Sequence, residues 1–173
     1  MRILFLGRFQ PFHNGHLEVV KYLVRMGEVL IAVGSAQSSG TFKNPFAYKE
    51  REMMIRAALE EAQLEVLDVV PIKDIYNHAR WAEHVKAVAP SYDAIFTNSS
   101  TDRHIFEFAG ERVMKEWLFK REIYEGKKVR EAMAADKGWK ELVPPAVVKV
   151  LEEIGGIQRL KILKEKGPSG EEQ

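Results

Sequence analysis

Two histidines and an arginine lie close together near the start of the chain, in a pattern that suits phosphate binding. Arg8 is followed by His13 and His16, which are three residues apart with Gly15 between them. The apolar run 3–6 precedes them and an amphipathic stretch follows, so a strand is expected to lead through a loop into a helix. A helix start offers backbone N–H groups and the positive end of the helix dipole. We therefore expect a polyphosphate ligand here.

Histidines at this spacing have other interpretations. They are often ordinary surface or core residues, and they can also ligate a metal. The glutamate of a His-Glu-x-x-His metalloprotease helix is missing, however, and no metal site is predicted. Gly15 lets the backbone approach a ligand closely because it has no Cβ, and Arg8 adds positive charge. The phosphate interpretation is therefore favoured over the other two.

The elements that must position these residues are predicted from apolar periodicity. Runs of strand length alternate with helix-like stretches, which predicts an α/β fold with a doubly wound parallel sheet. Ligands of such sheets bind at the carboxyl ends of the strands, so the loops that follow the strands are expected to gather there. The expected strands are 3–6, 29–33, 64–70 and 94–97, and the expected loops are 7–15, 34–47, 71–80 and 97–101.

The C-terminal third is predicted to be mostly helical. A weaker strand is expected near 112–116. Pro144 and Pro145 suit the start of a helix that Gly155 and Gly156 would end. The expected helices are 127–136, 144–154 and 157–164. We expect one domain over residues 1–164 and a disordered polar tail over residues 165–173.

Composition narrows the classes of function. The 173 residues include 26 basic and 25 acidic side chains, so no global positive field suggests nucleic acid as a partner. There is no cysteine, which excludes a disulfide framework and a thiol nucleophile. We see no signal-peptide pattern and no apolar run near the ~20 residues that span a membrane. A cytoplasmic protein is expected.

The run 7–16 reads Gly-Arg-Phe-Gln-Pro-Phe-His-Asn-Gly-His. It resembles the signature of the HxGH nucleotidyltransferase superfamily, and in its longer form the archaeal type of nicotinamide mononucleotide (NMN) adenylyltransferase. The resemblance continues in order to about Leu163. The further matching residues are Gly34-Ser35-Ala36-Gln37, Asn44-Pro45-Phe46, Glu50-Arg51, Trp81 with His84-Val85, and Val129-Arg130.

This resemblance implies a Rossmann-like nucleotidyltransferase fold and a reaction. ATP and NMN would give NAD and pyrophosphate, with the NMN phosphate attacking the α-phosphorus of ATP directly and in line. Such a reaction needs no protein nucleophile, only groups that position two anions and neutralise charge on the leaving pyrophosphate. Mg²⁺ would travel with ATP. The resemblance also implies a homo-oligomer, often a hexamer, and use of nicotinic acid mononucleotide by some members.

The resemblance assigns the ATP side of the site to basic and small residues. Lys43 is expected to act as a charge clamp in a flexible loop, although an ordinary solvated lysine is an equal alternative. Arg51 is equally interpretable as an exposed charge on a helix. The expected catalytic residues are His13, His16, Lys43 and Arg130, and the expected ATP and phosphate ligands are Arg8, Gly15, Gly34, Ser35, Arg51, Thr97, Asn98 and Lys127.

The acceptor side is expected to hold aromatic and amide side chains. Trp81 suits stacking on an electron-poor pyridinium ring, and Asn77 and Phe9 are the other expected NMN contacts. For Trp81 and Phe9 the alternative is an ordinary core residue, and His84 is expected to be structural.

Departures from the family pattern keep two other functions open. Glu125 and Lys127 stand where the family has serine and threonine, so an anion replaces one hydroxyl donor near the phosphates. Gly40 and His78 replace a histidine and an asparagine of the family. One alternative is a nucleotidyltransferase with another phosphate acceptor, such as FMN or a phosphopantetheine. The other is a non-catalytic nucleotide-binding relative.

Overall fold

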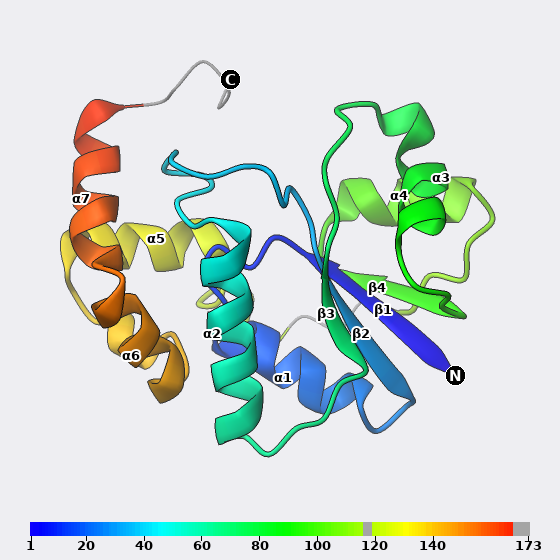
Figure 1. Ribbon diagram of the computed structural model, residues 1–173, viewed down its shortest axis with the longest axis horizontal. Coiled ribbons are helices and arrows are strands. Elements are labelled where there is room, and N and C mark those ends of the chain that lie inside the picture. Colours follow the sequence, from blue (N-terminus) through cyan, green and yellow to red (C-terminus); the bar gives the residue numbers. More distant parts are fainter. Residues whose placement is uncertain (116–118, 168–173) are drawn as a thin grey trace. The chain divides into compact units, whose positions relative to one another are not determined.

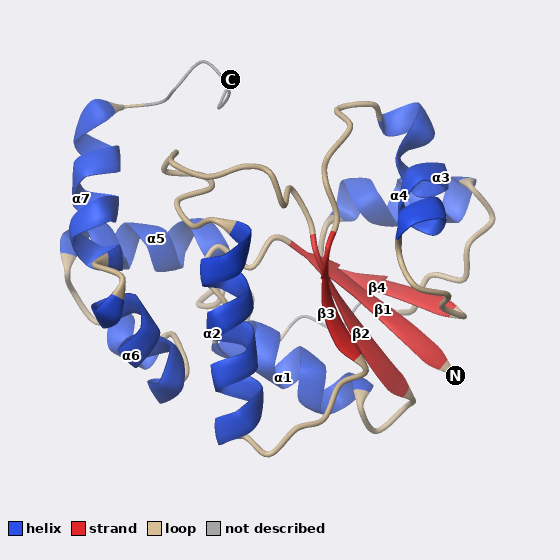
Figure 2. Ribbon diagram, in the orientation of Figure 1, coloured by secondary structure: helices blue, strands red, loops and turns tan. Residues whose placement is uncertain are grey.

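A four-stranded parallel sheet organises the fold (Figures 1 and 2). The computed structural model describes residues 1–115 and 119–167. The strands are β1 (Arg2–Gly7), β2 (Glu28–Val33), β3 (Asp68–Pro71) and β4 (Ala94–Thr97), in the order β3-β2-β1-β4. Strand β2 pairs with one side of β1, and β3 pairs with β2. Strand β4 then pairs with the other side of β1. This order is the doubly wound pattern, and the predicted fold class is confirmed.

Helices connect the strands and make up the C-terminal part. Over the described ranges, no helix is both long and apolar enough to cross a membrane. The helices are α1 (Asn14–Leu23), α2 (Tyr48–Glu61), α3 (His78–Val88), α4 (Ser100–Phe108), α5 (Gly126–Ala135), the 3₁₀ turn η1 (Trp139–Glu141), α6 (Pro145–Glu153) and α7 (Gly156–Lys166).

The chain forms two compact units. The first comprises residues 1–8 and 19–37 with the described part of 65–118, and it contains the whole sheet. The second comprises residues 9–18 and 38–64 with the described part of 119–173. It contains the start of α1 together with α2, α5, α6 and α7.

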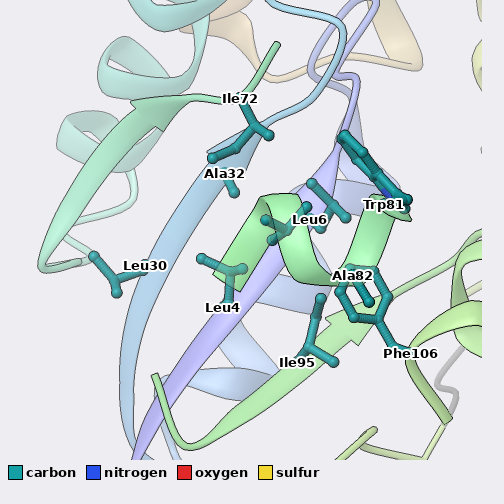
Figure 3. Close-up of a cluster of buried hydrophobic side chains, with 10 residues drawn as sticks. Leu4, Leu6, Leu30, Ala32, Ile72, Trp81, Ala82, Ile95 and Phe106 are labelled. Carbon is teal, nitrogen blue, oxygen red and sulfur yellow. The ribbon is translucent and has the colours of Figure 1, made fainter. Parts of the chain in front are cut away.

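The first unit has a core between the sheet and the helices α3 and α4. Aliphatic side chains from the strands meet Trp81 and Ala82 of α3 and Phe106 of α4 (Figure 3). The apolar residues 3–6 of β1 are all buried, as is typical of strands in a parallel sheet. The other members of this cluster are Leu4, Leu6, Leu30, Ala32, Ile72, Val85 and Ile95.

The second unit is built from packed helices. Helix α2 packs against α6, and α5 packs against α7. Its fully buried residues include Phe46, Met54, Val129, Met133 and Leu160. Gly155, with φ of +66°, allows the tight turn from α6 to α7 that the sequence predicts at this position.

Most predicted elements are confirmed, with two corrections. The strands at 3–6, 29–33 and 94–97 and the three C-terminal helices are present within a few residues of their predicted bounds. The third strand begins at Asp68 rather than residue 64. Leu67 is 44% exposed, so the apolar pattern there extends beyond the segment that pairs. Helix α4 was not predicted.

Two further predictions fall partly outside the described residues. In place of a strand at 112–115, Val113 makes one isolated bridge to Ile95, and residue 116 lies outside the description. Of the predicted tail, residues 165–166 belong to α7, and residues 168–173 lie outside the described part.

Candidate functional site

The two histidines of the motif hold each other at the start of α1. Their rings stack, with centroids 3.6 Å apart and planes 19° apart. The backbone N–H of His13 donates to Nδ1 of His16 at 3.2 Å, and the backbone N–H of His16 donates to Nδ1 of His13 at 3.3 Å. A backbone N–H only donates, so both Nδ1 atoms are acceptors. Each neutral ring therefore carries its proton on Nε2.

Burial keeps both rings neutral. It lowers the pKa of His13 to about 3, and the charge of Arg130 lowers it in the same direction. Burial also lowers the pKa of His16 well below its ordinary value, and the neighbouring His13 adds to that shift. At neutral pH the pair therefore offers Nε2–H donors, which suit anionic oxygens, and not imidazolium acids.

Gly15 is required by close packing. A Cβ at this position would lie 2.7 Å from Cβ of Tyr124 and 3.0 Å from the His13 ring. The Tyr124 ring is nearly parallel to the His13 ring, with centroids 6.3 Å apart. The glycine that was predicted to admit a ligand thus also admits the His13 ring and Tyr124.

Arg130 lies on α5 within the same unit. Its side chain is buried, and Nη1 donates to the backbone oxygen of Gln10 at 3.0 Å. A Cβ at Gly126 would lie 3.0 Å from this Nη1, so the guanidinium folds back over the start of its own helix. The guanidinium also lies 6.0 Å from the ring centroid of Phe42. The structure therefore brings Arg130 to the loop that contains Lys43.

Lys43 lies at the tip of a short turn. Thr41 N–H donates to the Asn44 carbonyl at 3.3 Å, and Asn44 N–H donates to Thr41 Oγ1 at 3.0 Å. These two bonds enclose Phe42 and Lys43. Lys43 itself is exposed. The turn places a lysine directly after the aromatic ring that contacts Arg130.

Arg51 is fully buried, which corrects the alternative of an exposed charge on a helix. It lies in the first turns of α2, and its Nη2 donates to the Ser38 carbonyl at 3.5 Å. A buried guanidinium next to the 38–47 loop suits a structural or an anion-binding role.

Two of the four departures from the family pattern, Glu125 and Lys127, lie at the start of α5. Glu125 is the N-cap residue but makes no side-chain capping bond, and its carboxylate lies 3.7 Å from Nζ of Lys128. Lys127 is exposed. An anion near a helix N-terminus is favourable for the helix, so Glu125 has a structural reason for its position.

Phe9 is buried against the motif histidines. Its φ of +55° is rare for a residue with a side chain, and its ring meets His16 edge-on at a centroid distance of 4.8 Å. Phe12 lies 5.5 Å from the His16 ring. The pair of rings limits water access to His16 and helps to keep it neutral.

In the first unit, the predicted residues follow adjacent strands. Gly7 of β1 pairs with Val33 of β2, and Leu6 of β1 pairs with Thr97 of β4. Arg8 follows β1, while Gly34 with Ser35 follows β2 and Asn98 follows β4. The predicted gathering of these loops at the carboxyl edge of the sheet is therefore confirmed within this unit.

Three of these residues show features typical of a binding site. Ser35 has φ of +46°, a strained backbone for a residue other than glycine. Oδ1 of Asn98 is buried and has no hydrogen-bond partner among the described residues. Burial lowers the pKa of Arg8, and the charge of Asp102 opposes that shift. Gly34 donates its N–H to Gly7 O at 2.8 Å, which fixes the turn.

The predicted acceptor residues of the first unit lie on or beside α3. Trp81 is only 8% exposed and belongs to the core of Figure 3, and one face of its indole stacks on His84 at 5.8 Å. His84 is held by a 3.0 Å bond to Lys73 O. Asn77 caps α3 by accepting from Arg80 N–H. Each of these side chains thus has a structural contact.

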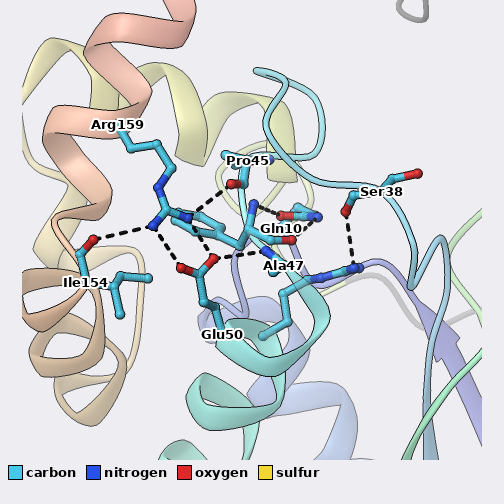
Figure 4. A network of polar contacts seen from close by, with 9 residues as sticks. Gln10, Ser38, Pro45, Ala47, Glu50, Ile154 and Arg159 are labelled. Atoms are coloured by element: carbon cyan, nitrogen blue, oxygen red, sulfur yellow. Dashed lines mark hydrogen bonds and ion pairs between the residues drawn. The ribbon is translucent and has the colours of Figure 1, made fainter.

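Sequence reasoning missed Gln10, which lies inside the motif. It is buried, its Nε2 donates to Phe46 O at 3.0 Å, and its Oε1 accepts from Phe46 N–H at 3.0 Å (Figure 4). A glutamine between apolar residues was the available signal, because a buried amide needs partners.

Across the residues that the structure describes, no three His, Asp or Glu side chains gather closely enough to hold a metal ion.

Fold and motif together define a nucleotidyltransferase. Residues 4–130 match the family described as Cytidylyltransferase-like, and the chain belongs to that family.

Within that family, the chain is similar to curated archaeal proteins named nicotinamide-nucleotide adenylyltransferase. It is 42% identical to the protein of Ignicoccus hospitalis over 170 residues, covering 96% of this chain and 99% of that protein. It is 39% identical to the protein of Picrophilus torridus, covering 95% and 98%. The protein of Archaeoglobus fulgidus is 38% identical, with 93% and 96% covered.

Solved structures share the fold. A bifunctional NMN adenylyltransferase/ADP ribose pyrophosphatase from Francisella tularensis, complexed with AMP and Mn ion, superposes with a TM-score of 0.75 at 24% identity. The match covers 94% of this chain and 51% of that one, so this chain spans about half the bifunctional protein. The Plasmodium falciparum nicotinic acid mononucleotide adenylyltransferase complexed with APC has a TM-score of 0.60 at 9% identity, covering 91% and 96%.

Proposed function

We propose that this protein transfers the adenylyl group of ATP to NMN, giving NAD and pyrophosphate. The observation that carries the proposal is the neutral, mutually bonded pair His13 and His16 beside the buried Arg130. A phosphate oxygen of NMN attacks the α-phosphorus of ATP. The bond between the α-phosphorus and the oxygen that bridges it to the β-phosphorus breaks, and its electron pair leaves with pyrophosphate. The protein forms no covalent bond in this step.

The second unit supplies the groups that act on the phosphates. His13 and His16 donate from Nε2 to ATP phosphate oxygens, and Arg130 neutralises charge that builds on the leaving pyrophosphate. Lys43 adds a charge from its turn. Lys127 and Arg51 contribute further positive charge to the ATP side. Gly15 serves by admitting the His13 ring to the helix start.

The first unit supplies groups for the nucleosides. Asn98 has a buried oxygen that needs a donor, such as the amino group of adenine or a ribose hydroxyl. Arg8 and the strained Ser35 turn contact phosphate or ribose, with Gly34 and Thr97 beside them.

NMN recognition is assigned to three residues. Trp81 stacks on the nicotinamide ring, because the flat face of an indole suits an electron-poor pyridinium ring. Asn77 and Phe9 complete the proposed acceptor contacts. Trp81 is 8% exposed and Phe9 is 1% exposed, so direct contact with NMN requires both side chains to become more accessible when the substrate binds.

Magnesium enters as part of the substrate. The phosphate oxygens of ATP would hold the ion, and Mg²⁺ would shield the negative charge of the phosphates. The Francisella tularensis protein was solved in complex with AMP and Mn ion, which is consistent with use of a divalent ion.

A second candidate keeps nucleotidyl transfer but changes the acceptor. It is favoured by Glu125, which places a carboxylate where the family has a hydroxyl donor. The test is a panel of equal concentrations of NMN, nicotinic acid mononucleotide, FMN and a phosphopantetheine, each with Mg²⁺ and either ATP or CTP, and with mass detection of products. Product should form fastest with ATP and NMN, and that product should be NAD. Faster product formation with FMN or the phosphopantetheine would establish the second candidate instead.

A non-catalytic role is the third candidate. It predicts that the folded protein binds ATP or NAD in calorimetry while no acceptor of the panel yields a product.

We also propose that the protein forms a homo-oligomer, with a hexamer as the state that the resemblance implies. Phe108 on α4 is 96% exposed and Val88 on α3 is 52% exposed, which is unusual for large apolar side chains. Light scattering after gel filtration tests this. A monomer at micromolar concentration would contradict it.

A further inference from the structure

Arg159 of α7 makes a two-pronged ion pair within the second unit. Its Nη1 and Nη2 donate to the two carboxylate oxygens of Glu50, at 2.6 and 2.7 Å (Figure 4). The same guanidinium donates to the carbonyls of Pro45 and Ile154, at 3.3 and 3.4 Å, and lies 5.6 Å from the Phe46 ring centroid. A two-pronged guanidinium–carboxylate pair fixes direction as well as distance.

Glu50 connects Arg159 to the loop that precedes α2. Its Oε2 also accepts from Ala47 N–H at 2.9 Å. Burial raises the pKa of Glu50, but the bonds from Arg159 and Ala47 outweigh burial and leave the pKa below its ordinary value. The carboxylate is therefore ionised at neutral pH, and one charged pair holds both ends of the segment Pro45–Ala47.

Phe46, the middle residue of that segment, is hydrogen-bonded to Gln10 of the motif. Both backbone groups of Phe46 are bonded to the side-chain amide of Gln10, and the backbone oxygen of Gln10 accepts from Arg130. Phe46 is fully buried, and its ring lies against Gly156 of α7, where an added Cβ would be 3.3 Å from the ring. A continuous series of contacts thus runs from α7 to the guanidinium of Arg130.

We propose that Arg159 is a positioning residue for adenylyl transfer, which orients Arg130 through Glu50, Phe46 and Gln10. This inference rests on the proposed function, because it takes Arg130 to contact ATP phosphate. Arg159 lies beyond residues 4–130, the part that matches the family, so it would be a contribution of the C-terminal helices to the reaction. Arg159 itself does not touch the reacting atoms.

The test compares Arg159→Met, which keeps the length of the side chain over Phe46, with Arg159→Lys, which keeps the charge but not the two-pronged bond. We expect kcat/KM for ATP to fall roughly tenfold or more in Arg159→Met, because small misplacements of phosphate ligands are costly. KM for NMN should change less than about twofold. Arg159→Lys should recover part of the loss. Where Arg159→Met does not fold, Glu50→Gln replaces it and should show the same selective loss.

Lys140→Met is the matched control. It removes another ion pair of the same unit, between Lys140 and Glu152 at 2.8 Å, which lies outside this series of contacts. Its kinetics should equal those of the wild type. Wild-type ATP kinetics in a folded Arg159 variant, or equal losses toward ATP and NMN, would overturn the inference.

A double variant separates this inference from the proposed function. Arg130→Met alone should lose activity, and adding Arg159→Met should cost little more, because the second residue acts through the first. Fully additive losses contradict the positioning role. Wild-type kinetics in folded Arg130→Met would instead contradict the role of Arg130 itself.

Discussion

At the scale of single residues, the proposed adenylyl transfer depends on two histidines that stay neutral. Their stacked rings exclude water from each other, and each ring nitrogen that faces the backbone is already an acceptor. What remains is a pair of fixed Nε2–H donors. Fixed donors stabilise developing negative charge without reorganising during the reaction.

Removal of one such donor should affect turnover more than acceptor binding. We expect His16→Ala to lower kcat about a hundredfold or more, because one preorganised donor to a developing anion is lost. KM for NMN should change much less. Steady-state kinetics with each substrate varied in turn measures both parameters. As a control, His104→Ala replaces an exposed histidine of α4 and should match the wild type. An unchanged kcat in the folded His16 variant would remove His16 from the mechanism.

The neutral state of His13 also predicts how stability depends on pH. Its folded-state pKa is about 3, below the ordinary 6.5, so the unfolded chain binds the proton more readily. The stabilisation is therefore complete above about pH 6.5 and is lost as the pH falls toward 3. As the pH falls from 7 to 5, protonation of His13 in the unfolded chain should lower the free energy of unfolding by about 2 kcal/mol. Chemical denaturation of the wild type and His13→Gln at both pH values tests this, and equal slopes with pH would contradict it.

Trp81 has both a core and a proposed binding role, and substitution can separate them. Trp81→Phe keeps apolar bulk and an aromatic face, so it should raise KM for NMN only a few-fold and leave KM for ATP unchanged. Trp81→Ala should raise KM for NMN more and also lower stability by about 3–5 kcal/mol. Thermal melts and kinetics of both variants provide the measurement. If KM for NMN is unchanged in both folded variants, Trp81 is a core residue only.

At this scale the sequence predicted which side chains carry charge but not how they are held. The spacing of His13 and His16 predicts that the two imidazole rings lie close together at the start of a helix, as the structure has them. The reciprocal bonds between them depend on ring rotation, which spacing does not encode. The bonds of Gln10 to Phe46 and of Arg159 to Glu50 join residues 36 and 109 positions apart, and no local pattern indicates them.

At the scale of elements, the sheet was predictable and one helix was not. Strands β1, β2 and β4 are continuous apolar runs, so burial and sequence agree. In α4, Phe106 is the buried residue, and polar side chains fill most of the helix. The available signal was Ser99, whose side chain caps the helix by accepting from Asp102 N–H at 3.1 Å. One capping residue followed by a helix with a single buried apolar residue is too weak a pattern to predict α4.

The start of α1 gives a prediction at this scale. Gly15→Ala would place a Cβ 2.7 Å from Tyr124 Cβ and 3.0 Å from the His13 ring, so one of these must move. We expect a loss of stability of about 1–3 kcal/mol together with a large loss of kcat, because overpacking displaces the ring. Urea denaturation and kinetics measure the two effects. A stable variant with full kcat would show that the helix start tolerates displacement.

At the scale of the whole molecule, the charges nearly cancel. The 26 basic and 25 acidic residues leave a net charge of +1, so the chain has no global field to attract polyanions. The proposed binding of ATP and NMN phosphates therefore depends on local groups, namely buried guanidiniums and neutral imidazoles. The match to the Cytidylyltransferase-like family ends at residue 130, while α6 and α7 lie beyond it. The helices past that point contribute Arg159 and its support of the motif.

The most direct test is a single turnover with enzyme in excess over ATP labelled at the α-phosphorus, with Mg²⁺ and NMN. If the adenylyl group passes directly to NMN, the amount of label found in NAD should equal the amount of pyrophosphate released. No label should stay on the protein. A folded protein that binds ATP but forms no NAD, or that retains label as an adenylylated residue, would contradict direct transfer to NMN.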